Sequence, residues 1–294
     1  MLQKCTLCPR QCRVDREDDT PSRGFCGMPA LPTAARAALH FGEEPCISGL
    51  NGSGTVFFSG CSLSCVFCQN REISHLKRGK TVSINRLCDI FKELEDQGAH
   101  NINLVNPTHF ASAIREALTR YRPSIPLVYN TGGYERVETL KSLEGLIDIY
   151  LPDLKYLSSE LSARLSGAKD YPDFATAAIL EMARQTGSPI LDENGMMKRG
   201  TMVRHLVLPG YTNQSIEVLK WLAQHKDKLW VSIMFQYTPM TEVPGAPSLS
   251  RTLTKRECEK IWDVVDALGL TDGYVQERES SGTGMIPLFD LTGI

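Results

Sequence analysis

The stretch "GTVFFSGCSLSCVFCQN", residues 54 to 70, places three cysteines within eight residues, directly after a run of β-branched and aromatic residues. This run predicts a buried strand, because such side chains suit a pleated surface. Cys61, Cys65 and Cys68 follow it, where an α/β sheet gathers its ligands beyond the carboxyl ends of its strands. The stretch therefore predicts both the first strand of the main sheet and a thiolate-bearing loop.

Short apolar runs then alternate with amphipathic segments as far as residue 275. The predicted strands are "TVFFSG", "INLVNP", "PLVYN", "LIDIYLPDL", "TMVRHLVLPG" and "LWVSIMFQ", with "GYVQE" as a candidate edge strand. The predicted helices are 83–98, a segment from Phe110 to Tyr121, 134–145, 158–187 in two pieces, 213–226, and a segment from Thr254 to Gly269. About six β-then-α units in series imply a parallel sheet with right-handed crossovers, so we expect an α/β fold, a partial (β/α)6 barrel.

The first fifty residues do not join this alternation and carry Pro, Gly and Cys instead. We therefore expect two parts: a small Cys-rich metal-binding subdomain over residues 1–50 and the barrel over residues 51–294.

Composition and charge narrow the class of protein. The 294 residues carry a formal net charge of −2 without a long basic run, so nucleic acid is not indicated as a partner. The N-terminus has no apolar signal segment and no stretch could span a membrane, so we expect a cytoplasmic protein. The ten cysteines are grouped at short spacings, which is typical of metal binding in a reducing compartment.

The number of thiolates after the first strand is informative. A structural zinc site closes its tetrahedron with four ligands, and a [4Fe–4S] cubane also normally takes four cysteines. Cys61, Cys65 and Cys68 have no obvious fourth partner nearby. An iron without a protein ligand could bind a small molecule.

"CSLSCVFC" resembles the CxxxCxΦC motif of the radical S-adenosylmethionine (SAM) superfamily, in which Φ is aromatic, here Phe67. The resemblance implies a [4Fe–4S] cluster whose open iron chelates SAM. It also implies one-electron cleavage of SAM to a 5′-deoxyadenosyl radical that abstracts hydrogen from a substrate.

Further segments resemble the pyruvate formate-lyase activating enzyme-like (PflX-type) group: "CVFCQNREI", "YNTGGY", "LPDLKY" and "VRHLVLPG". The resemblance implies that six residues contact SAM: Asn70, Asn130, Thr131, Asp153, Lys155 and Arg204. It also implies an electron donor such as flavodoxin or ferredoxin.

Two departures from that group concern the SAM site. "NLVNPTHF" replaces a Gly-Gly-Glu segment that binds the SAM amino group, which leaves Asn106 and Thr108 as the inferred substitutes. Asn130 stands where the activating enzyme has an aspartate, and a neutral amide does not replace the charge of a carboxylate.

A second group of cysteines, Cys5, Cys8, Cys12 and Cys26, has the spacing Cys-x2-Cys-x3-Cys-x13-Cys. Four thiolates suffice for a zinc ion, a mononuclear iron or a cubane, so we expect a second metal site here. The spacing leaves the metal open, and structural and redox roles are equally compatible with it.

The remaining candidates favour structural interpretations. Cys88 and Cys258 fall on apolar helix faces and suit the core. The loop position of Glu43 and Glu44, beside Cys46, favours solvated carboxylates. His109 and His205 stand beside strand ends, where a proton donor and a hydrogen-bonded scaffold residue are equally plausible. Gln236 and Tyr237 are candidates for the substrate side, and we assign no catalytic residue.

Three functions fit these observations. The resemblance favours a generator of protein radicals that abstracts a glycine hydrogen from a glycyl-radical enzyme. A radical SAM enzyme that modifies a small molecule, a peptide or RNA is the alternative, because fold and cofactor do not fix the substrate. A nonenzymatic iron–sulfur or zinc protein is the third.

Overall fold

The computed structural model describes residues 1–240, 242–277, 282, 284 and 286–294. Its centre is a ten-stranded sheet with the order β10-β9-β8-β6-β5-β4-β2-β1-β3, and β7 pairs with β8 beside this path. The strands are β1 (Thr33–His40), β2 (Ser53–Phe58), β3 (Lys80–Thr81), β4 (Ile102–Val105), β5 (Leu127–Thr131), β6 (Ile149–Pro152), β7 (Ile190–Leu191), β8 (Met197–Leu206), β9 (Trp230–Met234) and β10 (Gly273–Val275).

All the strands from β2 to β10 along this path run parallel to their neighbours. The sheet stays open, because the described strands β3 and β10 form its two edges. The predicted α/β fold with a mostly parallel sheet is confirmed, and "GYVQE" supplies the expected edge strand. The Asn-Gly pair at residues 194 and 195 lies in the turn between β7 and β8.

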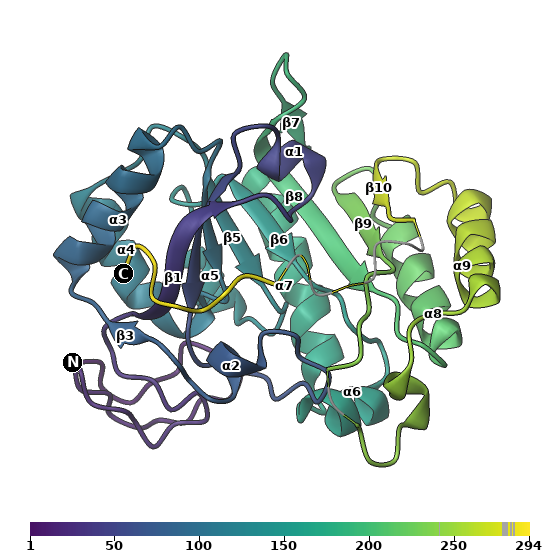
Figure 1. Cartoon of the computed structure of the whole chain (residues 1–294), viewed down its shortest axis with the longest axis horizontal. Helices are drawn as coiled ribbons and strands as arrows, with labels where there is room; N and C mark the ends of the chain where they lie inside the picture. Colours follow the sequence, from purple (N-terminus) through teal and green to yellow (C-terminus); the bar gives the residue numbers. More distant parts are fainter. Residues whose placement is uncertain (241, 278–281, 283, 285) are drawn as a thin grey trace.

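The helices follow the strands along the chain, as the alternation predicts (Figure 1). They are α1 (Pro45–Ser48), α2 (Arg71–Ser74), α3 (Ile84–Asp96), α4 (Ala111–Arg120), α5 (Val137–Lys141), α6 (Ser159–Ser166), α7 (Tyr171–Thr186), α8 (Thr212–Ala223) and α9 (Lys255–Leu268), with 3-10 turns η1 (Thr108–Phe110) and η2 (Pro247–Ser250). No helix of the described residues is long and apolar enough to cross a bilayer.

Local sequence explains where the better-defined helices begin and end. The Ser83 hydroxyl accepts from the Arg86 backbone N–H at the start of α3, and Leu87, Ile90 and Phe91 bury its apolar face. Thr254 and Glu257 form a capping box at the start of α9, and Gly269 ends that helix in the left-handed conformation. The helix predicted over 134–145 is shorter, because only the five residues of α5 are helical before a series of turns.

The longest strand that was not predicted is β1 (Thr33–His40). β1 has the sequence "TAARAALH", and alanine is depleted in strands, so its sequence gives little β signal. It is nevertheless antiparallel to both β2 and β3 and lies inside the main sheet. The C-terminal segment crosses back to β1, where Ala37 N–H donates to the Thr292 carbonyl at 2.8 Å (Figure 1). The proposed division at residue 50 therefore separates strands that share one sheet.

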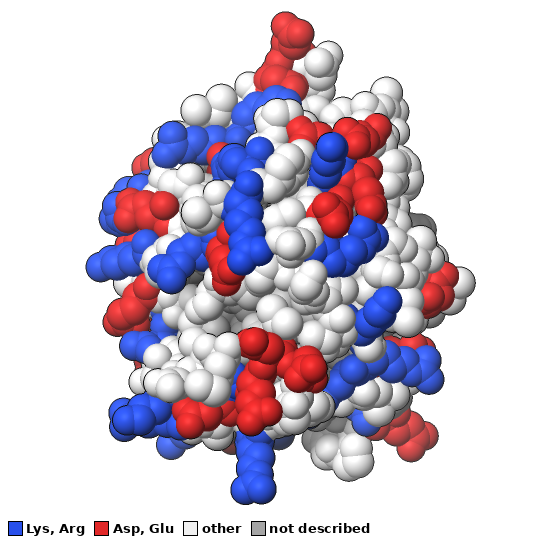
Figure 2. All heavy atoms as spheres, turned by 90° about the vertical axis from the view of Figure 1, so that its left-hand side faces the viewer, with Lys and Arg blue, Asp and Glu red and all other residues white. Residues whose placement is uncertain are grey.

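The face that carries α3, α4 and the N-terminal loops mixes both signs of charge. Figure 2 shows Lys and Arg interspersed with Asp and Glu across it, without a continuous patch of one sign. This mixture accords with the net charge of −2.

Candidate functional site

A pocket opens beyond the carboxyl ends of the parallel strands, and its lining gathers most of the predicted site residues. These are Cys61, Cys65, Phe67, Cys68, Asn70, Asn106, Asn130, Thr131, Asp153, Lys155 and Arg204. The loop after β2 supplies the cysteines, β5 and β8 supply Asn130, Thr131 and Arg204, and Asp153 and Lys155 directly follow β6. Parallel strands bring residues far apart in sequence to one edge of the sheet, and this topology assembles the pocket.

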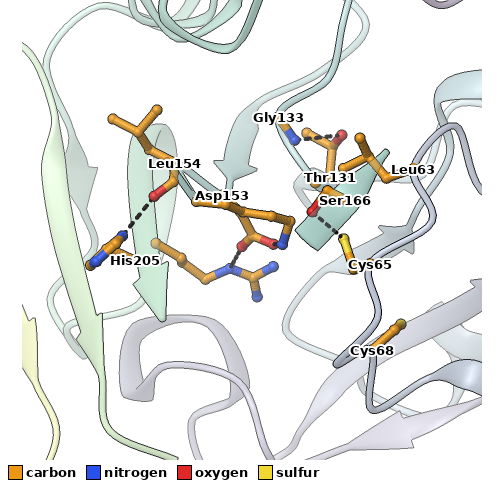
Figure 3. Close-up of polar contacts among 12 residues, drawn as sticks. Leu63, Cys65, Cys68, Thr131, Gly133, Asp153, Leu154, Ser166 and His205 are labelled. Carbon is orange, nitrogen blue, oxygen red and sulfur yellow. Dashed lines mark hydrogen bonds and ion pairs between the residues drawn. The ribbon is translucent and has the colours of Figure 1, made fainter. Parts of the chain in front are cut away.

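The cysteine loop is tied to α6. Ser64 N–H donates to the Ser166 carbonyl at 3.1 Å, and Val66 N–H donates to the Leu165 carbonyl at 2.9 Å. The Cys65 sulfur lies 3.0 Å from the Ser166 hydroxyl, as Figure 3 shows. These contacts join the cysteine loop to the C-terminal end of α6.

Two of the three cysteines in the pocket have raised pKa values. Burial raises the pKa of Cys61 to about 12, and the neighbouring Cys65 adds to the rise. Burial also raises the pKa of Cys65. The thiols of Cys61 and Cys65 are therefore neutral near pH 7, and binding of a metal by these two residues would release protons.

The arrangement of the cysteines suits a cluster. In the described part of the chain, no three His, Cys, Asp or Glu side chains converge as ligands of a single metal ion. In a cubane each thiolate ligates a different iron, so Cys61, Cys65 and Cys68 need not converge on one point.

Asn70 gives a second observation in favour of a ligand beside the cysteines. Its amide oxygen is buried and has no hydrogen-bond partner among the described residues, although the residue lines the pocket. Buried acceptors are nearly always satisfied, so an orphaned one at the edge of a pocket is expected where a donor binds. The SAM amino group is a donor of this kind.

Asp153 is the centre of a buried charged network. Its carboxylate accepts from Lys155 Nζ at 2.6 Å and from Arg204 Nε at 3.1 Å (Figure 3). Burial raises the pKa of Asp153, but Lys155 and Arg204 outweigh it, and the net pKa lies below the usual value. Burial likewise lowers the pKa of Lys155 and Asp153 reverses this, so both groups stay charged.

Glu43 completes this network, and the expectation that Glu43 and Glu44 are solvated is wrong. One oxygen of Glu43 accepts from Arg204 Nη1 at 3.0 Å, and the other accepts from Asn103 and Asn130 at 3.0 and 3.1 Å. The side chain of Glu43 is only 10% exposed. Glu43 thereby places a carboxylate beside Asn130, the residue that stands where the activating enzyme has an aspartate.

Of the two inferred substitutes for the Gly-Gly-Glu segment, Asn106 lines the pocket and Thr108 does not. Asn106 lines the pocket with φ at 58°, and its amide donates to the Gly60 carbonyl at 2.5 Å. Thr108 does not belong to the pocket lining, and its hydroxyl donates to Glu135 instead. Positive φ is uncommon for residues other than glycine and is concentrated at functional sites.

Glu135 was not singled out in the sequence. It is fully buried, and its carboxylate accepts from the hydroxyls of Thr108 and Thr131 and from Tyr129 at 3.4 Å. Burial raises its pKa to about 7, although these hydrogen bonds oppose the rise. Thr131 links this carboxyl to the pocket.

His109 and His205 are scaffold residues. His109 Nε2 lies 2.7 Å from the Ser59 carbonyl, and His205 Nδ1 lies 2.7 Å from the Leu154 carbonyl. Burial lowers their pKa values to about 3 and about 4, so both rings are neutral near pH 7. Neither residue belongs to the pocket lining.

The candidates for the substrate side do reach the pocket. Gln236 and Tyr237 line it, and the Tyr237 ring centroid lies 6.4 Å from that of Phe67. Gln236 and Tyr237 therefore line the same pocket as the Asp153 network.

The remaining cysteines divide into two classes. Cys46 and Cys258 are buried and Cys88 is half-buried, away from the pocket lining. Cys5 and Cys8 are buried, Cys26 is half-buried and Cys12 is exposed, all in the loops that precede β1.

Comparison with known proteins establishes the family. Residues 55–222 match the Radical SAM superfamily. An uncharacterized protein of Methanocaldococcus jannaschii, MJ0674, is 31% identical over 280 residues, which cover 92% of this chain and 76% of that protein. The chain belongs to the radical SAM superfamily, whose enzymes use a [4Fe–4S] cluster and SAM.

One of the similar solved structures shares the fold of this chain. Streptococcus suis SuiB bound to precursor peptide SuiA has a TM-score of 0.51 at 14% identity, with 74% of this chain and 47% of SuiB covered. The chain thus spans about half the length of SuiB. A methylornithine synthase, PylB, has a TM-score of 0.47 at 14% identity, with 74% of this chain and 68% of PylB covered.

Removal of the Glu43 charge tests the network. We expect Glu43→Gln to lower the free energy of unfolding by about 3 kcal/mol, because it leaves the buried Arg204 with one carboxylate fewer. Denaturant titration in a reducing buffer measures the loss. The control is Glu93→Gln, whose exposed pair with Arg86 predicts a loss below about 1 kcal/mol. Equal losses in the two variants would contradict a structural role for Glu43.

The raised pKa of Glu135 predicts that the free energy of unfolding depends on pH. Its pKa of about 7 in the folded chain exceeds the ordinary 4.5, so the folded chain holds a proton that the unfolded chain releases. The stability contributed by this proton is complete below pH 4.5 and is lost as the pH rises through 7, by up to about 3 kcal/mol. Glu135→Gln should lack this loss. Parallel pH profiles of wild type and variant between pH 4.5 and 8 would refute the assignment.

Proposed function

We propose that this chain binds a [4Fe–4S] cluster at Cys61, Cys65 and Cys68 and cleaves SAM reductively beside it. The observation that carries the proposal is the orphaned oxygen of Asn70, which lines the same pocket as the three cysteines and the Asp153 network. When bound, cluster and SAM supply methionine and a 5′-deoxyadenosyl radical at the cost of one electron.

In this proposal, the residues that line the pocket bind SAM and orient it. Asn70 accepts from the SAM amino group, and Asp153, Lys155 and Arg204 present fixed charges to the polar parts of SAM. Asn106, Asn130 and Thr131 line the remaining polar side. The apolar and aromatic wall of Leu63, Phe67 and Tyr237 limits access of water, which protects a radical from side reactions.

The first candidate for the substrate is a glycyl-radical enzyme, whose glycine would receive the radical. The support for this class is the likeness of residues 54–210 to pyruvate formate-lyase activating enzymes. Modification of a small molecule, a peptide or RNA is the second candidate. Flavodoxin or ferredoxin is the proposed electron donor, and the cytoplasm is the proposed location.

The N-terminal cysteines belong to the proposal as a second metal site. Cys5, Cys8, Cys12 and Cys26 offer four thiolates in loops stabilised by backbone hydrogen bonds, such as Cys5 N–H to the Val14 carbonyl at 2.8 Å. This number closes the coordination of a metal and leaves no open position.

Cys65→Ala tests the proposed catalysis. We expect it to reduce formation of 5′-deoxyadenosine from SAM under dithionite by at least about 100-fold, because a cluster with two thiolate ligands is not held. Chromatography of the anaerobic reaction measures the product. Cys88→Ala, which removes a cysteine outside the pocket, should retain wild-type turnover. Retained cleavage in Cys65→Ala would contradict the cluster assignment.

The substrate class requires a separate measurement. Pyruvate formate-lyase is the test acceptor, incubated anaerobically with the reduced enzyme and SAM. Radical transfer to protein predicts a glycyl-radical signal in electron paramagnetic resonance that is absent with Cys65→Ala. If SAM is cleaved without such a signal, the first candidate fails for this acceptor and the second takes its place.

A further inference from the structure

Tyr171, the first residue of α7, has a hydroxyl that contacts the backbone at two neighbouring strand ends. The residue is fully buried and lies outside the pocket lining. Its hydroxyl oxygen lies 2.7 Å from the Asp153 carbonyl and 3.0 Å from the Gly132 carbonyl, and both can accept its proton. The same oxygen accepts from the Lys155 backbone N–H at 3.0 Å. The hydroxyl thus serves as donor and as acceptor for residues that follow β5 and β6.

These three backbone groups extend the contact between β5 and β6 past the ends of the two strands. Asp153 N–H donates to the Thr131 carbonyl at 2.9 Å, one residue beyond the last register pair of the strands. Past this bond, the Tyr171 hydroxyl joins Gly132, which follows β5, to Asp153 and Lys155, which follow β6. All three of its partners line the pocket, as does the adjoining Thr131. The hydroxyl therefore connects two parts of the pocket wall from behind.

The two strand ends approach so closely that they leave no room for a side chain at position 133. Gly133 has φ at 81°, in the left-handed region that favours glycine. A Cβ at this position would clash with the Asp153 carbonyl oxygen and would lie 3.0 Å from the Tyr171 hydroxyl oxygen. The hydroxyl and the Asp153 carbonyl thus occupy the space that a larger residue would need.

Two other aromatic side chains hold the ring of Tyr171. Its centroid lies 6.1 Å from that of Tyr134 in a stacked arrangement and 5.8 Å from that of Tyr156 in an edge arrangement. Tyr134 is fixed in turn, because its hydroxyl donates to Asp170 at 2.6 Å. Burial raises the pKa of Tyr171, so its hydroxyl keeps the proton that it donates. The packing therefore directs a neutral hydroxyl at the strand ends.

We propose that Tyr171 is a positioning residue of the SAM site, whose hydroxyl sets the spacing between the ends of β5 and β6. The inference rests on the proposed binding of SAM in this pocket. Thr131 comes from one strand end, and Asp153 and Lys155 come from the other. A ligand that contacts both ends therefore meets polar groups whose separation is already fixed. Such preorganisation raises affinity, because less conformational freedom is lost on binding.

Hydrogen exchange of the full chain tests the contact itself. We expect Tyr171→Phe, which removes only the hydroxyl, to speed exchange of the Lys155 backbone N–H by about 10-fold, because this N–H loses its acceptor. Mass spectrometry of peptides that cover residues 153–156 measures the rate. Tyr150→Phe is the matched control, since Tyr150 is equally buried and its hydroxyl donates to Gln185, outside the pocket lining. Equal exchange at Lys155 in wild type and Tyr171→Phe would overturn the inference.

The affinity for SAM tests what the contact does in the cluster-loaded chain. Tyr171→Phe should raise the Kd for SAM by about 10-fold and Tyr150→Phe by less than about 2-fold, although both variants lose one buried hydrogen bond and a similar amount of Tm. At saturating SAM, both should form 5′-deoxyadenosine within about 3-fold of the wild-type rate, because positioning for binding changes KM more than kcat. An equal Kd in the two variants would overturn the role of Tyr171 and leave the SAM site standing. A wild type that binds no SAM would instead overturn the proposed function.

If Tyr171→Phe does not fold, the wild type alone still tests the inference. Coupling between two equilibria is reciprocal, so SAM should slow exchange of the Lys155 N–H in the cluster-loaded chain by about 10-fold. Peptides of α9, which lies outside the pocket lining, are the control and should exchange at an unchanged rate. Exchange at Lys155 that does not respond to bound SAM would overturn the inference.

Discussion

The pocket depends on the pairing of Arg204 with Asp153 and Glu43. Arg204 lies on β8, Asp153 follows β6, and Glu43 comes from the loop between β1 and α1, so one guanidinium joins three parts of the chain. Each of these side chains is at most 18% exposed. Burial makes each charge costly alone, and the chain therefore keeps all three in contact.

The sequence predicted the parallel sheet well, because its strands and helices carry clear apolar periodicity. It also predicted most of the pocket, because residues directly after parallel strands meet at one edge. It did not predict β1, whose alanines give no β signal, and it misjudged Glu43. A local pattern cannot show that a loop forty residues from the N-terminus will fill the position where Asn130 lacks a charge.

Two buried arginines in this chain are satisfied in different ways. Arg204 is paired with the carboxylates of Asp153 and Glu43. The guanidinium of Arg16 instead donates to three backbone carbonyls, those of Met28, Pro29 and His109. Arg16 thereby ties the N-terminal loops to the segment that precedes α4.

The contact between Glu43 and Arg204 also bears on the order in which the contacts of the pocket form during folding. It joins residues 161 positions apart, whereas β2 and β4 can pair as soon as α3 has formed between them. Contacts of such long range form late, since the entropy of closing the intervening loop is lost before they contribute. During synthesis, Glu43 leaves the ribosome well before Arg204. The charged network around Asn130 and Asp153 is therefore complete only after β8 has been synthesised and has joined the sheet.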